Sequence, residues 1–93
     1  MPKNRAFKNR DRFIQLGIAI ATLRKLRGMS QEQLADKAFC SRSHVSSIEA
    51  PNIVHPFSLE IFFNIADALD IEPSELLHYA SVLSEPHKKD DKS

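Results

Sequence analysis

Residues 28–51 have the sequence GMSQEQLADKAFCSRSHVSSIEAP, which predicts two short helices joined by a tight turn. At the start of the first helix, Ser30 and Gln33 have the spacing of a capping box. In such a box the serine hydroxyl accepts from the glutamine backbone N–H, and the glutamine side chain reaches back to the serine backbone. We therefore expect a helix over residues 31–38. Because a helix of this length is marginal alone, it must pack against neighbouring helices.

The second helix of the pair begins after a turn at residues 39–40. Ser41 is a favoured capping residue and marks its start. Pro51 ends it, since the residue before a proline is disfavoured in the helical conformation. Helices over residues 31–38 and 42–50, with a tight turn between them, have the dimensions of a helix-turn-helix.

Three further helices are predicted outside this pair, because apolar side chains recur there at three- and four-residue intervals. Asp11 is expected to cap the first and Ser58 the second, and Pro73 suits the first position of the third. The three helices are expected at residues 12–27, 59–69 and 73–83. No segment reads convincingly as a strand, so the sequence predicts an all-α fold, a compact domain of five helices.

The two ends of the chain differ in composition from the rest. Residues 1–10 are basic and poor in apolar side chains, and we interpret them as a flexible basic arm. Residues 85–93 contain Pro86 and a run of charged side chains, and we expect a disordered tail there. The helix-turn-helix domain, with its last helix as an extension, is therefore expected to span residues 11–84.

Charge is unevenly distributed along the chain, although the formal net charge is only +1. Residues 1–27 hold eight Lys or Arg and one acidic residue, whereas residues 51–87 hold six acidic residues and no Lys or Arg. Such a division favours one side or arm that meets a polyanion. From charge alone, a basic segment that is solvated and has no partner is an equally good interpretation.

The residue types present argue against several classes of protein. We see no clustered acid–base pair, no nucleophile beside a matched base and no phosphate-binding glycine loop, so we do not expect an enzyme. The four histidines and the single Cys40 lack metal-ligand spacing, so we expect neither a metal nor a cofactor. No apolar run approaches the roughly 20 residues of a membrane span. A lone cysteine favours a reducing compartment, and we expect a cytoplasmic protein.

Many separate positions between residues 13 and 79 carry the pattern of a known family. In the first half they are Leu16, Gly17, Ile20, Leu23, Arg24, residues 28–31, residues 33–35, Lys37, Ala38, residues 41–43, Val45, Ser46, Ile48 and Glu49. In the second half they are Ser58, Leu59, Ile65, Ala66, Ala68, Leu69 and residues 74–77. This pattern resembles the lambda-repressor-like, or Cro/C1-type (XRE), helix-turn-helix. The resemblance implies a lambda-repressor-like DNA-binding domain whose partner is double-stranded DNA.

The resemblance also implies roles for single residues. The helix at about residues 41–50 is expected to be the recognition helix, with its first half in the major groove. Arg42 is the foremost candidate, because arginine pairs with guanine through two hydrogen bonds. The expected DNA contacts are Gln31 at a phosphate, Arg42, Ser43 and Ser47 at base edges, His44 and Ser46 close by, and Asn52 and His55 along the backbone. Gln31 is also expected to brace the recognition helix. Arg24 and Glu49 match the family's paired arginine and glutamate, which link the first helix to the recognition helix.

The chain departs from the family at two places. Phe39 occupies a turn position that usually holds glycine, so either Phe39 adopts the left-handed conformation or the turn has another shape. Ala50 and Pro51 stand where the family often has a basic residue and glycine. A phosphate contact common in relatives is therefore expected to be missing, and the basic arm is expected to replace it.

The last helix continues past the family's usual core through Tyr79, Val82 and Leu83. These side chains either lengthen the helix against its own domain or form an exposed apolar strip for a dimer. We expect a homodimer, since two recognition helices related by a two-fold axis read both half-sites of a palindromic operator. The predicted function is a sequence-specific transcriptional regulator that acts as a repressor. The alternative is an antitoxin-type protein that binds a toxin partner and autoregulates its operon.

Overall fold

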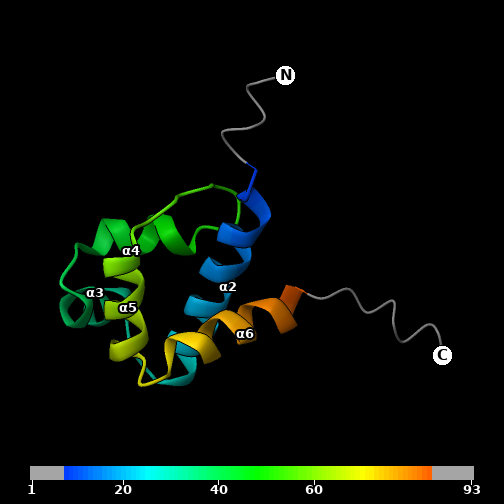
Figure 1. Cartoon of the computed structure of the whole chain (residues 1–93). Helices are drawn as coiled ribbons and strands as arrows, with labels where there is room; N and C mark the ends of the chain where they lie inside the picture. Colours follow the sequence, from blue (N-terminus) through cyan, green and yellow to red (C-terminus); the bar gives the residue numbers. More distant parts are fainter. Residues whose placement is uncertain (1–7, 85–93) are drawn as a thin grey trace.

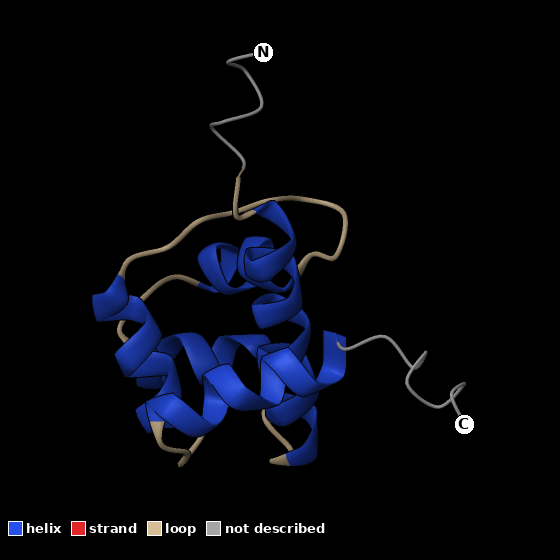
Figure 2. Cartoon of the chain, turned by 45° about the vertical axis from the view of Figure 1, so that its right-hand side comes forward, coloured by secondary structure: helices blue, strands red, loops and turns tan. Residues whose placement is uncertain are grey.

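The computed structural model describes residues 8–84 and folds them into five helices, with no strand in that range (Figures 1 and 2). The helices are α2 (Arg10–Leu26), α3 (Gln31–Ala38), α4 (Arg42–Glu49), α5 (Leu59–Ala68) and α6 (Pro73–Ser84). The all-α prediction is confirmed, and α3 and α4 form the predicted pair of short helices. The predicted tail and the first seven residues of the predicted arm lie outside the described residues.

Serine side chains begin three of the helices at the predicted positions. Ser30 Oγ accepts from the backbone N–H of Gln33 at 3.0 Å, and Gln33 Oε1 accepts from the backbone N–H of Ser30 at 2.8 Å. The capping box is therefore complete. The hydroxyls of Ser41 and Ser58 each accept from the backbone N–H three residues later, at 3.0 and 3.1 Å. These bonds fix where α3, α4 and α5 begin.

The start of α2 differs from the prediction. Its N-cap is Asn9 rather than Asp11, and Asn9 makes no side-chain cap bond. Instead, the amide oxygen of Asn9 accepts from Arg12 Nη1 at 2.6 Å. Asp11 lies inside the first turn, where its negative charge interacts favourably with the helix dipole. Arg10, the last residue of the expected arm, is thus the first residue of α2.

All five helices contribute to one core. Its largest fully buried side chains are Ile20 from α2, Leu34 from α3, Val45 from α4, Ile65 from α5, Leu76 from α6, and Leu69 directly after α5. Burial of each such side chain stabilises the fold by roughly 1.5–3 kcal/mol. The short helices α3 and α4 are therefore stabilised by packing against the other helices, because a helix of this length is marginal alone.

Gly17 marks the closest approach of α2 to α4. A Cβ atom at this position would overlap the carbonyl oxygen of Ile48, near the C-terminal end of α4. Glycine alone leaves room for the two backbones at this separation. The identity of residue 17 therefore sets how closely α4 packs against α2.

The turn between α3 and α4 has the left-handed conformation at Phe39, with φ 60° and ψ 44°. The backbone N–H of Cys40 donates to the carbonyl of Ala35 at 3.0 Å and closes the turn. Phe39 is 82% exposed, so its ring adds little to the core. The turn thus keeps the shape that a glycine gives in relatives, and the first of the two possibilities left open by the sequence is the one observed.

Two side chains bond to backbone carbonyls at the ends of other helices. Asn64 of α5 donates from Nδ2 to the carbonyl of Ala38, the last residue of α3, at 3.1 Å. Arg27, directly after α2, donates from Nε to the carbonyl of Leu69, directly after α5, at 2.7 Å. Carbonyls at helix ends lack partners in their own helix, so these bonds satisfy them and fix α2 and α3 relative to α5. In Figure 1, α3, α4 and α5 gather on the left, and α6 packs against α2 on the right.

Candidate nucleic-acid interface

The recognition helix predicted from the sequence is α4, and one of its sides faces solvent. Val45 and Ile48 anchor the opposite side in the core. The solvent side carries Arg42, Ser43 and Ser46, which are exposed, and Ser47 and His44, which are half-buried. The polar side chains of α4 are therefore presented outward by a helix whose inner side is fixed.

Arg42 is the first residue of α4. Its guanidinium forms no hydrogen bond or ion pair with another residue of the described range 8–84. It also lies at the positive end of the α4 helix dipole, where a negatively charged or electron-rich partner is stabilised. Five N–H donors in a planar fork are thus exposed at the tip of the helix.

A buried ion pair holds the other end of α4. Arg24 Nε donates to Glu49 Oε2 at 2.8 Å, and Arg24 Nη2 donates to Glu49 Oε1 at 3.0 Å. The third guanidinium nitrogen, Nη1, donates to the carbonyl of Met29 at 2.7 Å, in the loop between α2 and α3. The structure therefore places together the two residues that the family resemblance paired, and their charges are hydrogen-bonded on both sides.

Gln31 joins this network from the first residue of α3. Its Nε2 donates to Glu49 Oε1 at 2.9 Å, which agrees with the bracing of the recognition helix that the family resemblance implied and identifies Glu49 as the partner. The second Nε2 hydrogen is not used by this bond, and the backbone N–H of a first helical residue has no intrahelical partner. Gln31 is half-buried, so the same side chain both braces α4 and keeps a donor for a ligand.

The loop from residue 50 to residue 58 runs past α4 (tan in Figure 2). Asn52 is exposed there and His55 is half-buried. The ring of Phe57 meets the ring of Phe13 of α2 edge to face, with centroids 5.6 Å apart, which ties the end of the loop to the domain.

His55 also meets His44 of α4. The distance from His55 Nε2 to His44 Nδ1 is 3.2 Å, and the two rings are edge to face at 4.9 Å and 73°. Because these residues lie in different kinds of structure, eleven positions apart, no periodicity could have paired them. The loop is therefore attached directly to a residue of the predicted recognition helix.

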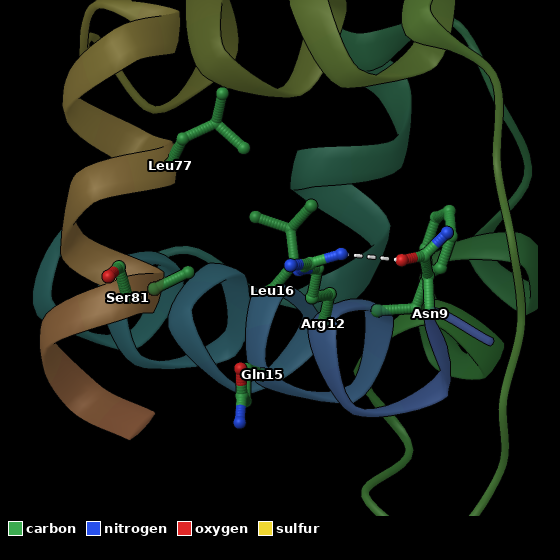
Figure 3. A pocket seen from close by; sticks show the side chains of 8 residues that line it. Asn9, Arg12, Gln15, Leu16, Leu77 and Ser81 are labelled. Carbon is green, nitrogen blue, oxygen red and sulfur yellow. Dashed lines mark hydrogen bonds between the residues drawn. The ribbon is translucent and has the colours of Figure 1, made fainter. Parts of the chain in front are cut away.

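The predicted dimer residues on α6 do not share one environment. Tyr79 is half-buried and packs against the core of its own domain, whereas Val82 and Leu83 are 49% and 42% exposed. Leu77, which the sequence analysis did not single out, is 53% exposed on the same helix. Leu77 also borders a groove of about 520 Å³ between α6 and the start of α2, which Figure 3 shows from close by. The groove is lined by Asn9, Arg12, Phe13, Gln15, Leu16, Leu77, Ala80 and Ser81.

Few other side chains in residues 8–84 are reactive or suited to bind a metal. Burial raises the pKa of the Cys40 thiol, which leaves less of the nucleophilic thiolate at neutral pH. Within residues 8–84, no three or more His, Cys, Asp or Glu side chains are grouped as metal ligands are. No helix in that range has the length and apolar character to cross a membrane.

A tight α3–turn–α4 unit, braced from behind and polar on its free side, defines a helix-turn-helix DNA-binding protein. The chain belongs to the Cro/C1-type helix-turn-helix family, since the family model described as helix-turn-helix matches residues 20–76. It is thus a DNA-binding transcriptional regulator with a lambda-repressor-like fold. Among solved structures, the restriction-modification controller protein C.AhdI from Aeromonas hydrophila is 38% identical, with a TM-score of 0.64. The match covers 69% of this chain and 94% of C.AhdI. No curated protein matches the sequence.

Proposed function

We propose that the protein binds a palindromic site in double-stranded DNA as a homodimer, with α4 of each copy in the major groove, and represses transcription there. The exposed side of α4 carries this proposal. It presents an unpaired arginine beside serine hydroxyls, on a helix that Val45, Ile48 and the Arg24–Glu49 pair hold in place. Donors and acceptors on a rigid helix are what sequence readout in the major groove requires.

The base contacts come from the exposed side of α4 and begin at Arg42, its first residue. Arg42 donates two parallel hydrogen bonds to O6 and N7 of a guanine. Ser43 and Ser47 lie one helical turn apart and reach neighbouring base edges, with Ser46 beside them. Since serine accepts from and donates to several bases, Arg42 supplies most of the discrimination.

Phosphate contacts position the helix on the duplex. The backbone N–H of Gln31 and the free hydrogen of its side chain donate to one phosphate, at the positive end of the α3 dipole. Asn52 and His55 lie along the backbone on the other side of α4, in the loop that follows it. Because the Gln31 side chain also bonds to Glu49, a phosphate bound there stabilises the orientation of α4.

The charge distribution supports this orientation. Lys and Arg are concentrated in residues 1–27, and the acidic residues in 51–87. A protein with such a division approaches a polyanion with its basic side. The basic arm is expected at residues 1–10, whose first seven residues lie outside the described range. It adds phosphate contacts from Lys and Arg, which the loop after α4 does not contain.

A second copy of the chain binds at α6. Val82 and Leu83 expose apolar surface on one helix that its own domain does not cover. Tyr79 packs beneath them against the core and supports the helix. Two copies joined there by a two-fold axis present two α4 helices to half-sites about one helical turn apart.

The similarity to C.AhdI, a restriction-modification controller, supports a regulatory role of the same kind. Occlusion of a promoter requires only tight and specific binding, and the proposed interface needs no ligand-binding domain for it. A dimer of this small chain responds to its own concentration, because the dimer forms only as the protein accumulates.

Selection of bound sites from a random duplex library, at two salt concentrations, tests the proposal. We expect enrichment of a palindrome with half-sites about 10 base pairs apart, and loss of that enrichment in Arg42→Ala. Salt-sensitive binding without an enriched site would contradict sequence-specific recognition. A stable complex with a co-expressed toxin in that case would favour the antitoxin function instead.

A further inference from the structure

The contact between His55 and His44 has a consequence for what α4 recognises. Two ring nitrogens 3.2 Å apart share one hydrogen, so one ring donates and the other accepts. The residues involved are a loop histidine and a histidine of the recognition helix. Which nitrogen of His44 carries a proton is therefore set by a residue outside α4.

The direction of the hydrogen bond follows from the tautomers that it requires. If His55 Nε2–H donates to His44 Nδ1, both neutral rings carry their proton on Nε2. The reverse bond needs both protons on Nδ1. Neutral histidine in water favours the Nε2–H tautomer, so the first arrangement uses the favoured form twice. A protonated His55 also donates through Nε2, so its charge state does not reverse the bond.

His44 is then left with a hydrogen on its other nitrogen, Nε2. No residue in the described range 8–84 bonds to that nitrogen, and His44 is half-buried at the edge of the solvent side of α4. An Nε2–H at this position is a donor without an acceptor. In the major groove it suits a base edge that accepts. Guanine presents two neighbouring acceptors there, whereas adenine has one acceptor beside its N6 donor and thymine has one acceptor beside its methyl group.

We propose that His55 is a positioning residue that fixes His44 as a hydrogen-bond donor, so that His44 selects an acceptor edge, guanine, at one base pair of each half-site. The proposal rests on the proposed function, because it assumes that α4 lies in the major groove. It adds a determinant of specificity in a loop residue that itself need not touch a base. Without His55, both tautomers of His44 are accessible, and a donor edge such as cytosine N4 is then accepted as well.

The tautomer is measured first, in the full-length chain without DNA. Imidazole ¹⁵N chemical shifts distinguish protonated from unprotonated ring nitrogens, and we expect His44 to carry its proton on Nε2 near pH 7.5. In His55→Ala we expect the His44 shifts to move toward the average of two tautomers. A wild-type His44 with its proton on Nδ1 would overturn the proposal before any DNA is added.

Base preference is measured second, by site selection with three variants. His44→Ala and His55→Ala are both expected to lose guanine preference at the same base pair, on the order of tenfold. His55→Lys is the matched control, since its ammonium can donate to His44 Nδ1 but cannot accept from it, and the variant should retain the preference. The thermal unfolding midpoint of each variant shows that the domain is folded in the assay.

The possible outcomes separate this inference from the proposed function. A wild-type chain that enriches no site would contradict the proposed function and, with it, the role of His44 at a base. Wild-type enrichment with an unchanged preference in His55→Ala would overturn the inference alone. Equal loss of preference in His55→Lys and His55→Ala would also overturn it, because the donated hydrogen would then not be what matters.

Discussion

Arg24 and Glu49 form two parallel hydrogen bonds, of 2.8 and 3.0 Å, between the last turn of α2 and the last residue of α4. Both residues are 92% removed from solvent, with 8% exposed. Gln31 donates to the same carboxylate from the start of α3. One glutamate therefore ties α2, α3 and α4 together at the C-terminal end of α4, and the position of α4 depends on it.

Removal of either charge is expected to destabilise the domain strongly. Arg24→Ala or Glu49→Ala leaves the other charge buried without its partner, and we expect a loss of about 3–5 kcal/mol in the free energy of unfolding. The double variant Arg24→Met/Glu49→Leu restores an apolar contact of similar volume and should lose far less. Urea unfolding measures all three. Equal losses in the single and double variants would mean that the pairing of the charges is not what stabilises α4.

The two glycines provide a second test of the packing of α4. Gly17→Ala places a methyl group where the carbonyl of Ile48 lies, and we expect a loss of about 3 kcal/mol because backbone must move. Gly28→Ala is the control, since the added Cβ would meet nothing within 4 Å and only the φ of 72° at this position is unfavourable for alanine. That conformation costs about 1 kcal/mol for alanine. Thermal or urea unfolding that ranks the two variants in the opposite order would exclude a close approach at Gly17.

Features that depend on local chemistry could be predicted from the sequence. The Ser30–Gln33 capping box follows from two residues at fixed spacing, and α3 begins where it predicts. The family's usual glycine at position 39 predicts either a left-handed Phe39 or a turn of another shape, and the left-handed conformation is the one observed. The start of α2 was missed by two positions, because Asn9 lacks the side-chain cap bond that makes a start recognisable.

Contacts between distant residues could not be predicted in this way. Gln31 and Glu49 are 18 positions apart, and His44 and His55 lie on a helix and in an irregular loop. Neither pair has a periodicity that a sequence pattern can express. Gly17 was noted only as a family match, since nothing in its neighbours shows that another backbone passes beside it. The positions of the candidate DNA-binding residues and the Arg24–Glu49 pair thus followed from the family resemblance, but the contacts of Gln31 with Glu49 and of His55 with His44 required the three-dimensional structure.

Arg42 is expected to provide base discrimination rather than general affinity. Arg42→Ala should weaken binding to the selected operator by about 1–3 kcal/mol and relax preference at one base pair of each half-site. Lys37→Ala removes the same charge from the exposed last turn of α3 and should leave the base preference unchanged. Competition binding with operators altered at single base pairs measures both effects. An unchanged preference profile in Arg42→Ala would assign Arg42 to a phosphate instead.

The α6 surface is expected to hold the dimer together. Leu83→Glu places a charge in the proposed interface, and we expect the dimer to weaken by about 2 kcal/mol or more because that charge is buried without a partner. His78→Glu adds an acid at another exposed position of α6 and serves as the control. Sedimentation equilibrium measures the monomer–dimer equilibrium. If Leu83→Glu dimerises as the wild type does, the second copy binds elsewhere on the domain.

The basic arm is expected to contribute salt-dependent affinity without sequence preference. Deletion of residues 2–7 removes Lys3 and Arg5 but leaves Asn9 and the start of α2 intact. Each phosphate contact contributes about 0.9 to the slope of log affinity against log salt, so loss of two contacts should flatten the slope by about 2. Lys88→Gln/Lys89→Gln removes two charges from the opposite end of the chain and should leave the slope unchanged. A deletion variant with the wild-type slope would show that the arm makes no phosphate contact, and the cations of α2 would then account for the basic side of the molecule.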